Sequence, residues 1–269
     1  MADVVTVEIL AEPGSTHGGR VEWMLDLIDL AKAAGCDAIK WQFLSSATRL
    51  CDRRRAPNYH AAYTLIQGDA TLWTYLVRET HARGLRAIAT AYLPEDVQPI
   101  ADAGVDAIKI SSFEASDGAL LRRAEQTGRP LYVSTGMMAA LEVQAVFAHC
   151  TPAVLFHCAS VYPAPPEALN LRVLMQWDRV FRHHRIGFSD HSAEFITGAL
   201  AVAAGAEVLE VHCRHPETPE TNADYATAHG ARGLETYVEA VRFTEMALGT
   251  GLKAPHPAED AMRMYRVQP

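Results

Sequence analysis

Short apolar runs of the kind that form β-strands recur along the whole chain, separated by longer segments. They are rich in Val, Ile, Leu and Ala. Such a run is typical of a strand buried in a parallel sheet. We expect eight of these runs to be strands, at residues 4–10, 38–43, 86–91, 107–110, 131–134, 154–158, 186–189 and 208–213.

Most of the segments between these runs carry apolar residues at helical spacing. In the first, Val21, Leu25, Ile28 and Ala31 fall on one face, with charged residues on the other. Strands that alternate with helices predict a parallel sheet. Eight strands with eight helices fit a (β/α)8 TIM barrel better than a doubly wound open sheet. We therefore predict an α/β protein with one TIM-barrel domain, residues 1–269.

One pattern is repeated at three of the predicted helix-to-strand junctions. At Gly35, Gly104 and Gly205 an alanine precedes the glycine and an acidic residue follows two positions later. We expect each glycine to end a helix in the left-handed conformation. Ionisable or polar residues stand five and seven positions after each glycine, and strand alternation places both on one face near the carboxyl end. They are Lys40 and Gln42, Lys109 and Ser111, and Glu210 and His212.

The charge balance argues against a nucleic-acid partner. The chain has 24 Lys and Arg against 32 Asp and Glu, a net charge of −8, and this offers no field to hold a phosphate backbone. No apolar stretch approaches the roughly 20 residues of a membrane span. Residues 1–5 lack the positive start and apolar run of a signal peptide. We expect a cytoplasmic protein with no membrane partner.

The cysteines are odd in number, scattered, and form no C-x-x-C pair. This argues against both a disulfide framework and a zinc knuckle. We expect the five to be small, buried, apolar side chains. They are Cys36, Cys51, Cys150, Cys158 and Cys213.

Polar residues gather where the predicted strands end, more than a purely structural barrel needs. Lys40 and Lys109 converge there with several hydroxyl groups. Two cations with Ser and Thr donors suit a bound phosphate or carboxylate. In the alternative interpretation, each lysine pairs with a neighbouring acid and holds no ligand.

Two histidines stand at the ends of the last two predicted strands. They are His191 and His212, with Asp190 and Glu210 beside them. Two imidazoles and a carboxylate would bind one divalent ion. Alternatively, each histidine is a hydrogen-bonded residue of the core.

The longest connection between predicted elements runs from residue 45 to residue 70 and contains Arg53, Arg54 and Arg55. A segment of this length is either a solvated loop or a lid. As a lid it would bring positive charge to an anionic ligand.

These motifs together resemble the catalytic barrel of the N-acetylneuraminate (sialic acid) synthase family, from about residue 7 to residue 248. The resemblance implies a TIM barrel that condenses phosphoenolpyruvate with an aldehyde sugar. Its motifs occur in order along the chain and fall at the predicted strand ends. They include AEPG at 11–14, IKWQF at 39–43, KISS at 109–112, STGM at 134–137, YPAPP at 162–166, GFSDH at 187–191 and EVH at 210–212.

The resemblance also implies roles for individual residues. Glu12 matches the family's essential carboxylate, and with it we assign a catalytic role to Asp190. His191 and His212 match the ligands of a manganese ion, with magnesium or cobalt as alternatives. The residues assigned to phosphoenolpyruvate are Lys40, Thr90, Lys109, Ser112, Ser134, Ser160 and Ser189, and those assigned to the acceptor are Gln42, Tyr162 and Asp224.

The implied activity is that of a metal-dependent transferase that forms a 2-keto-3-deoxy sugar acid, releases phosphate and works as a homodimer. The metal polarises the acceptor aldehyde, carbon 3 of the enol phosphate attacks it, and water adds at carbon 2. Glu12 stabilises the cationic centre or manages the proton of the water.

The acceptor half departs from the family. THGG at 16–19 and NADY at 222–225 replace the family's usual segments, and no antifreeze-like carboxy-terminal domain follows the barrel before Pro269. From these differences we expect an acceptor other than N-acetylmannosamine. The arginines of residues 45–70 favour an acceptor that carries a carboxylate or a phosphate.

Two alternative functions stay open at this point. A 3-deoxy-heptulosonate or octulosonate phosphate synthase uses the same donor but needs a second phosphate site, for which Arg53 to Arg55 are the spare basic cluster. A non-catalytic barrel could bind phosphoenolpyruvate or a sugar acid as a sensor. The presence of Glu12 and both histidines counts against a sensor, because a binder has no need of a metal.

Overall fold

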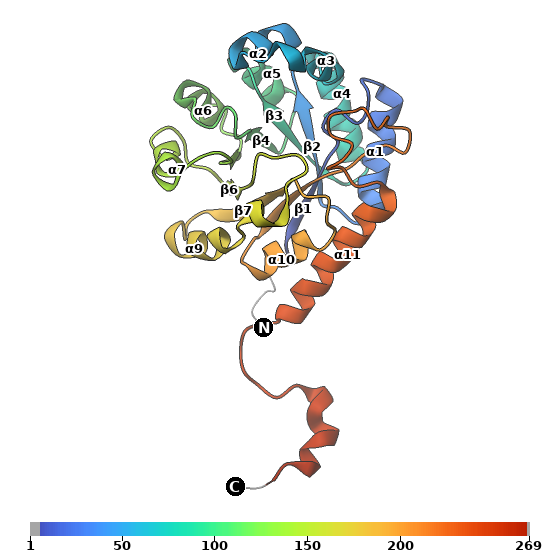
Figure 1. Cartoon of the computed structure of the whole chain (residues 1–269), viewed down its shortest axis with the longest axis vertical. Helices are drawn as coiled ribbons and strands as arrows, with labels where there is room; N and C mark the ends of the chain where they lie inside the picture. Colours follow the sequence, from blue (N-terminus) through green and yellow to red (C-terminus); the bar gives the residue numbers. More distant parts are fainter. Residues whose placement is uncertain (1–5, 268–269) are drawn as a thin grey trace.

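The computed structural model describes residues 6–267 and shows a closed barrel of eight parallel strands (Figure 1). Each strand pairs with the strands before and after it in the chain, and β8 closes onto β1. The predicted TIM barrel is confirmed. The strands are β1 (Glu8–Glu12), β2 (Ala38–Phe43), β3 (Arg86–Ala91), β4 (Ala107–Ile110), β5 (Leu131–Ser134), β6 (Val154–His157), β7 (Arg185–Asp190) and β8 (Val208–His212).

The first strand differs most from its predicted bounds. Residues 4–10 were expected, whereas β1 ends at Glu12; residues 4 and 5 lie outside the described residues. The reason is pairing, because β1 is in register with β8 from Glu8 opposite Val208 to Glu12 opposite His212. The partner strand therefore carries β1 two residues beyond the apolar run, and Glu12 sits on a rigid strand end.

Helices surround the barrel on the outside (Figure 1). Residues 45–70, expected as a loop or lid, are instead mostly helical, in α2, a 3-10 turn (Pro57–Tyr59) and α3. The helices are α1 (Val21–Ala34), α2 (Ala47–Arg54), α3 (His60–Leu65), α4 (Ala70–Ala82), α5 (Val97–Asp102), α6 (Gly118–Glu125), α7 (Ala140–Val146), α8 (Pro166–Leu169), α9 (Arg172–Val180), α10 (Thr197–Ala203) and α11 (Ala231–Leu248).

The buried face of α1 is rotated relative to the expected stripe. Met24 and Leu27 are buried with Ile28 and Ala31, while Val21 and Leu25 are only partly covered. Both stripes obey helical spacing, so the sequence pattern left the rotation of the helix open. After α11, residues 249–267 run away from the barrel as an exposed segment that contains a 3-10 helix (Pro257–Tyr265) (Figure 1).

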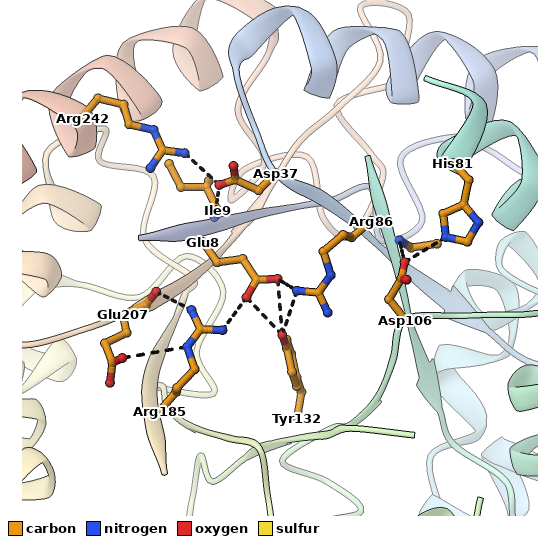
Figure 2. A network of polar contacts seen from close by, with 11 residues as sticks. Glu8, Ile9, Asp37, His81, Arg86, Asp106, Tyr132, Arg185, Glu207 and Arg242 are labelled. Atoms are coloured by element: carbon orange, nitrogen blue, oxygen red, sulfur yellow. Dashed lines mark hydrogen bonds and ion pairs between the residues drawn. The ribbon is translucent and has the colours of Figure 1, made fainter. Parts of the chain in front are cut away.

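The repeated junctions fold as the glycine pattern predicted. Gly35, Gly104 and Gly205 have φ angles of 86°, 90° and 107°, in the left-handed region that favours glycine. The acid two positions after each glycine accepts a hydrogen bond from the backbone of the adjacent strand, which fixes strand register; Figure 2 shows the bond between Ile9 and Asp37. These bonds run from Ile9 N–H to Asp37 (2.8 Å), from Ala87 N–H to Asp106 (2.7 Å) and from Ile186 N–H to Glu207 (3.4 Å).

The middle of the barrel is filled by apolar side chains, so it is a core and not a pore. Among residues 6–267, polar side chains lie in the barrel interior on either side of this layer, around Glu8 at the amino ends of the strands and around Glu12 at the carboxyl ends. The layer consists of Leu10, Ala38, Ile88, Ala107, Tyr132, Val154, Phe156 and Val208.

Two further expectations concern the chain as a whole. All five cysteines are free and buried, as predicted. Among residues 6–267, no helix is both long enough and apolar enough to cross a bilayer.

Candidate active site at the carboxyl ends of the strands

A cavity of about 620 Å³ opens at the carboxyl ends of the strands. It is the end at which TIM barrels carry their active sites. Of the fourteen residues that the sequence analysis assigned, all but Thr90 and Asp190 line it. The lining residues are Glu12, Lys40, Gln42, Lys109, Ser112, Ser134, Ser160, Tyr162, Ser189, His191, His212 and Asp224.

The first of two buried ion pairs at the base of the cavity joins β1 and β2. The ammonium of Lys40 donates to Glu12 Oε1, and both side chains are almost fully buried. Gln42 Nε2 donates to the same oxygen at 2.6 Å. Glu12 Oε2 is 3.5 Å from His212 Nε2. Lys40 and Gln42 of β2 thus bind Oε1 of Glu12, and its Oε2 is left facing His212.

The second ion pair joins β4, β7 and β8. Lys109 Nζ donates to Glu210 Oε2 at 2.7 Å, and Ser189 Oγ donates to Glu210 Oε1 at 2.8 Å. Lys40 Nζ lies 4.0 Å from the same Oε1, so Glu210 faces both lysines. The Lys109 ammonium also sits 3.7 Å above the ring of Phe156. Each lysine therefore has an acidic partner, as the alternative interpretation expected.

The charges of this cluster depend on one another. Burial would raise the pKa of Glu210, but the ammonium groups of Lys109 and Lys40 outweigh it and hold that pKa below the usual range. Burial would lower the pKa of Lys40, but Glu12 and Glu210 raise it. Burial, with Lys40 nearby, lowers the pKa of Lys109. An ammonium has three donors, so each lysine keeps donors for a further anion.

Hydroxyl groups form a cradle beside Lys109. Gly136 N–H donates to Ser112 Oγ at 2.9 Å, and that oxygen lies 3.2 Å from Cys158 Sγ. Ser160 Oγ is buried and has no hydrogen-bond partner among the described residues. A Cβ at Gly136 would stand only 2.3 Å from it. Glycine is required here because the backbone approaches the three side chains closely, and the unpaired hydroxyl suits an anionic ligand.

His191 is held in one tautomer. Its Nδ1 lies 2.6 Å from the carbonyl oxygen of Ala159, and because a carbonyl only accepts, Nδ1 carries the proton. Burial, and then the nearby His212, lower the pKa of His191 to about 3, so the ring is neutral at pH 7. The free lone pair on Nε2 lies 3.2 Å from Ser189 Oγ.

The chemistry of the histidine pair fits a divalent metal ion. The rings of His191 and His212 lie 5.7 Å apart, and His212 Nδ1 is buried with no hydrogen-bond partner among residues 6–267. A histidine whose other nitrogen is fixed by a carbonyl is the usual metal-ligand arrangement. Within those residues no three His, Cys, Asp or Glu side chains already stand close enough to hold an ion. The pair therefore supplies two ligands and leaves positions for others.

The remaining wall next to the histidines is formed by Tyr162 and Asp224. The Tyr162 ring lies 4.2 Å from that of His191. Asp224 Oδ2 accepts from the backbone N–H of Ser15 at 2.7 Å and from its hydroxyl at 2.5 Å. A Cβ at Gly14 would lie 2.6 Å from the same oxygen and 3.4 Å from His212 Nδ1, so glycine lets this loop and Asp224 approach the histidine.

Two assigned residues do not line the cavity. Asp190 points outward from β7, where its carboxylate accepts from the hydroxyl of Tyr237 at 3.1 Å and from Ser192 N–H at 2.8 Å. Asp190 therefore joins β7 to α11 and does not face the cavity, and its catalytic role stays a prediction from the sequence. Thr90 follows the inward-facing Ile88 by two residues and is in register with Gln42 and Lys109, and its buried hydroxyl has no partner among the described residues.

Several functional candidates were not assigned from the sequence. Glu210 faces both lysines, and the third glycine repeat already carried the signal for it. A further wall is formed by α2, α3 and the ends of β3 and β4. The sequence pointed to it only through the arginines of residues 45–70 and, by the glycine repeat, through Ser111. Its side chains are Arg54, Tyr59, Tyr63, Tyr92, Ser111 and Phe113.

The fold and the site together define a TIM barrel with a buried two-lysine, two-carboxylate cluster and a histidine pair at its mouth. Residues 27–253 match the NeuB family. The chain therefore belongs to the NeuB family, and the family resemblance drawn from the motifs is confirmed.

Individual relatives agree with this assignment. The chain is 31% identical to the pseudaminic acid synthase of Campylobacter jejuni serotype O:2, over 91% of this chain and 76% of that protein. It is 26% identical to human N-acetylneuraminate-9-phosphate synthase, over 94% and 74%. The crystal structure of N-acetylneuraminic acid synthetase from Leptospira borgpetersenii, in complex with citrate, superposes with a TM-score of 0.87 at 27% identity, covering 98% and 92%.

A more distant likeness concerns the fold alone. A truncated 3-deoxy-D-arabino-heptulosonate 7-phosphate synthase from Thermotoga maritima has a TM-score of 0.68 at 16% identity, over 91% of this chain and 88% of that one. It shows the same barrel fold and nothing of the activity of this chain.

Proposed function

We propose that this chain is a phosphoenolpyruvate-dependent synthase that joins the donor to an aldehyde and releases phosphate. The product is a 2-keto-3-deoxy sugar acid. The observation that carries the proposal is the convergence of Lys40, Lys109 and the hydroxyl cradle at the base of one cavity, next to Glu12 and two histidines. Family membership supports the same class of reaction.

In this proposal, the donor anion binds between the lysines and the cradle. Its phosphate and carboxylate oxygens take the lysine donors that Glu12 and Glu210 leave free, together with the hydroxyls of Ser112, Ser134 and Ser160. Charge-assisted bonds of this kind are short and strong. The base of the cavity is buried, so the anion is shielded from water and gains more from each bond.

His191 and His212 would hold a divalent ion, manganese or alternatively magnesium or cobalt. When bound, such an ion supplies Lewis acidity toward the oxygen of the acceptor aldehyde. The neutral ring of His191 suits this role because its Nε2 lone pair is available.

The protein groups manage charge and protons. Carbon 3 of the donor forms a bond to the aldehyde carbon as the enol π electrons move, and positive charge develops at carbon 2. The C=O π bond of the aldehyde breaks, and its oxygen takes up a proton and becomes a hydroxyl of the product. Glu12 stabilises that charge and takes a proton from the water that adds there, through Oε2, the oxygen not bonded to Lys40 and Gln42. The tetrahedral intermediate then expels phosphate and leaves the 2-keto group.

The test is phosphate release from phosphoenolpyruvate with manganese and a panel of aldehydes, with the product identified by mass. We expect phosphate release that depends on one class of aldehyde and produces a keto acid whose mass is the sum of aldehyde and pyruvate. Tight donor binding without turnover of any aldehyde would favour the sensor alternative. The cytoplasmic location, the homodimer and the single domain of residues 1–269 stay predictions from the sequence; five free buried cysteines suit a reducing compartment.

A further inference from the structure

The wall of the cavity formed by α2, α3 and the ends of β3 and β4 has one cationic side chain, Arg54, and four of its five N–H donors have partners in the protein. Arg54 Nε and Nη2 donate to the two oxygens of Glu114 at 2.8 and 2.7 Å. Its Nη1 donates to Tyr63 Oη at 2.9 Å, and Nη2 also reaches Ser111 Oγ at 3.4 Å. The bidentate bond is the most specific arrangement between a guanidinium and a carboxylate.

The faces of the guanidinium are covered as well as its edge. Its central carbon lies 5.4 Å from the ring centre of Tyr63, 5.0 Å from that of Tyr92 and 4.6 Å from that of Phe113. The Arg54 side chain is 13% exposed and that of Glu114 is 2% exposed. The pair is therefore a closed, neutral unit that fastens α2 to the end of β4.

The rest of this wall offers no cation to an incoming anion. Besides the aromatic side chains and Ser111, it is lined by Ala56, Ala62 and Ile66. Arg53 does not line the cavity and pairs with Asp117, while Arg55 ends α2 and does not line it. On the opposite side, the carboxylate of Asp224 faces the same space. The arginines thus lose the role on which the expectation of an acidic acceptor rested.

We propose that the Arg54–Glu114 pair makes the acceptor compartment selective for an uncharged aldehyde, and that Glu114 is the specificity-determining residue. This inference rests on the proposed function. A phosphate or carboxylate entering the compartment would have to take Arg54 from Glu114, which would leave a buried carboxylate unpaired. An anionic acceptor is disfavoured because its binding leaves the buried carboxylate of Glu114 without its cation, and not because the acceptor clashes with the wall. An uncharged, partly apolar acceptor end fits against the aromatic and alkyl side chains without that cost.

The decisive variant is Glu114→Gln, because it keeps the size of the side chain and frees the charge of Arg54. The matched control is Arg53→Gln, which alters the neighbouring arginine outside the cavity. Both are compared with wild type by kcat/KM on N-acetylmannosamine and its 6-phosphate, arabinose and its 5-phosphate, and erythrose and its 4-phosphate. For every pair in which a member reacts, we expect wild type and Arg53→Gln to have a kcat/KM at least tenfold higher for the neutral member than for the phosphate. Glu114→Gln should shift that ratio at least tenfold toward the phosphate.

A binding measurement keeps this test separate from the proposed function. With phosphoenolpyruvate saturating, inorganic phosphate is titrated while the thermal midpoint is followed. Only Glu114→Gln should gain further stabilisation, because only there is Arg54 free. If no aldehyde reacts, the proposed function fails while this difference still stands. If phosphate stabilises wild type as much as the variant, the inference fails whatever the turnover.

A second variant covers the case in which Glu114→Gln does not fold. The double change Arg54→Met with Glu114→Met removes both charges together and therefore leaves no buried charge unpaired. We expect it to keep the wild-type preference for neutral aldehydes. Preference of wild type for a phosphorylated aldehyde, lost in the double variant, would show that Arg54 binds the acceptor anion and would overturn the inference.

Discussion

The two ends of the barrel carry similar charges arranged for different purposes. At the amino ends of the strands, Glu8 of β1 accepts from Arg86 and from Arg185, the latter at 2.8 Å, and from the hydroxyl of Tyr132 at 3.1 Å (Figure 2). At the carboxyl ends, Glu12 of the same strand accepts from Lys40, in the cluster that includes Lys109 and Glu210.

The difference lies in what each end leaves unsatisfied. The arginines around Glu8 are about two-fifths exposed, and each donates to a different oxygen of the carboxylate. Arg185 also donates to the carbonyl of Glu207 at 3.2 Å. The lysines at the other end are buried at the base of a cavity and keep unused donors, with the unpaired hydroxyl of Ser160 nearby. We interpret the ion-pair network around Glu8 as structural and the cluster at the carboxyl ends as a binding site.

The largest expected effect is on turnover. Glu12→Gln keeps the shape and one hydrogen bond to Lys40 but cannot accept a proton from water, so kcat should fall about 10²- to 10⁴-fold. The change is checked by phosphate release, with circular dichroism showing that the barrel is intact. A variant that kept most of the wild-type kcat would remove Glu12 from the chemistry.

The second expected effect is on the pH dependence of folding stability, and we expect it to arise at the carboxyl end of the barrel. Burial lowers the pKa of His17, in the loop after β1, to about 4. The unfolded chain takes up this proton below its ordinary pKa of about 6.5, whereas the folded chain does so only near 4. Stability should therefore be lost as pH falls from 6.5 to 4, by a total on the order of 3 kcal/mol. Denaturant unfolding of wild type and His17→Gln measures it.

The variant should lose less stability than wild type over that pH range. Hydrogen exchange adds the spatial test, because the loop after β1 should open first while the Glu8 network keeps its protection. Parallel losses in wild type and His17→Gln would contradict the assignment to His17.

The third expected effect is on the ion-pair network around Glu8. Glu8→Gln leaves Arg86 and Arg185 without their shared carboxylate and should lower the free energy of unfolding by about 2 kcal/mol. This loss is smaller than that for a fully buried pair because the two arginines are partly exposed to solvent. The thermal midpoint, at about 2–4 °C per kcal/mol for a domain of this size, gives the readout. Donor affinity should be unchanged, and a parallel loss of it would mean that the two ends are not independent.

Local patterns in the sequence predicted most of the fold. The glycine repeats predicted where three strands begin and that Lys40, Lys109 and Glu210 point into the barrel. Both predictions depend only on neighbouring residues, because a left-handed helix cap and the alternation of side chains along a strand are local features. The same alternation, applied to Asp190 between the inward Ser189 and His191, would have predicted its outward direction. The rotation of α1 and the end of β1 depended on packing partners elsewhere in the chain.

The acceptor side of the site was not predictable in this way. Arg54 and Glu114 meet across sixty residues of chain, and nothing in the local sequence of either specifies the pairing. The positive charge of the arginine cluster is evident from the local sequence, but the partners of these arginines are not. Only the fold shows that Arg53 and Arg54 are neutralised by acids beyond β4.

The central claim is that the carboxyl end of the barrel binds phosphoenolpyruvate through its lysines, and direct donor titration tests it. Lys109→Met removes one charge-assisted contact, for about 1.5 to 3 kcal/mol, and should weaken donor binding roughly ten- to a hundredfold. Arg185→Gln, which removes a cation at the opposite end, should bind the donor as wild type does. Unchanged donor affinity in a folded Lys109→Met variant would contradict the account.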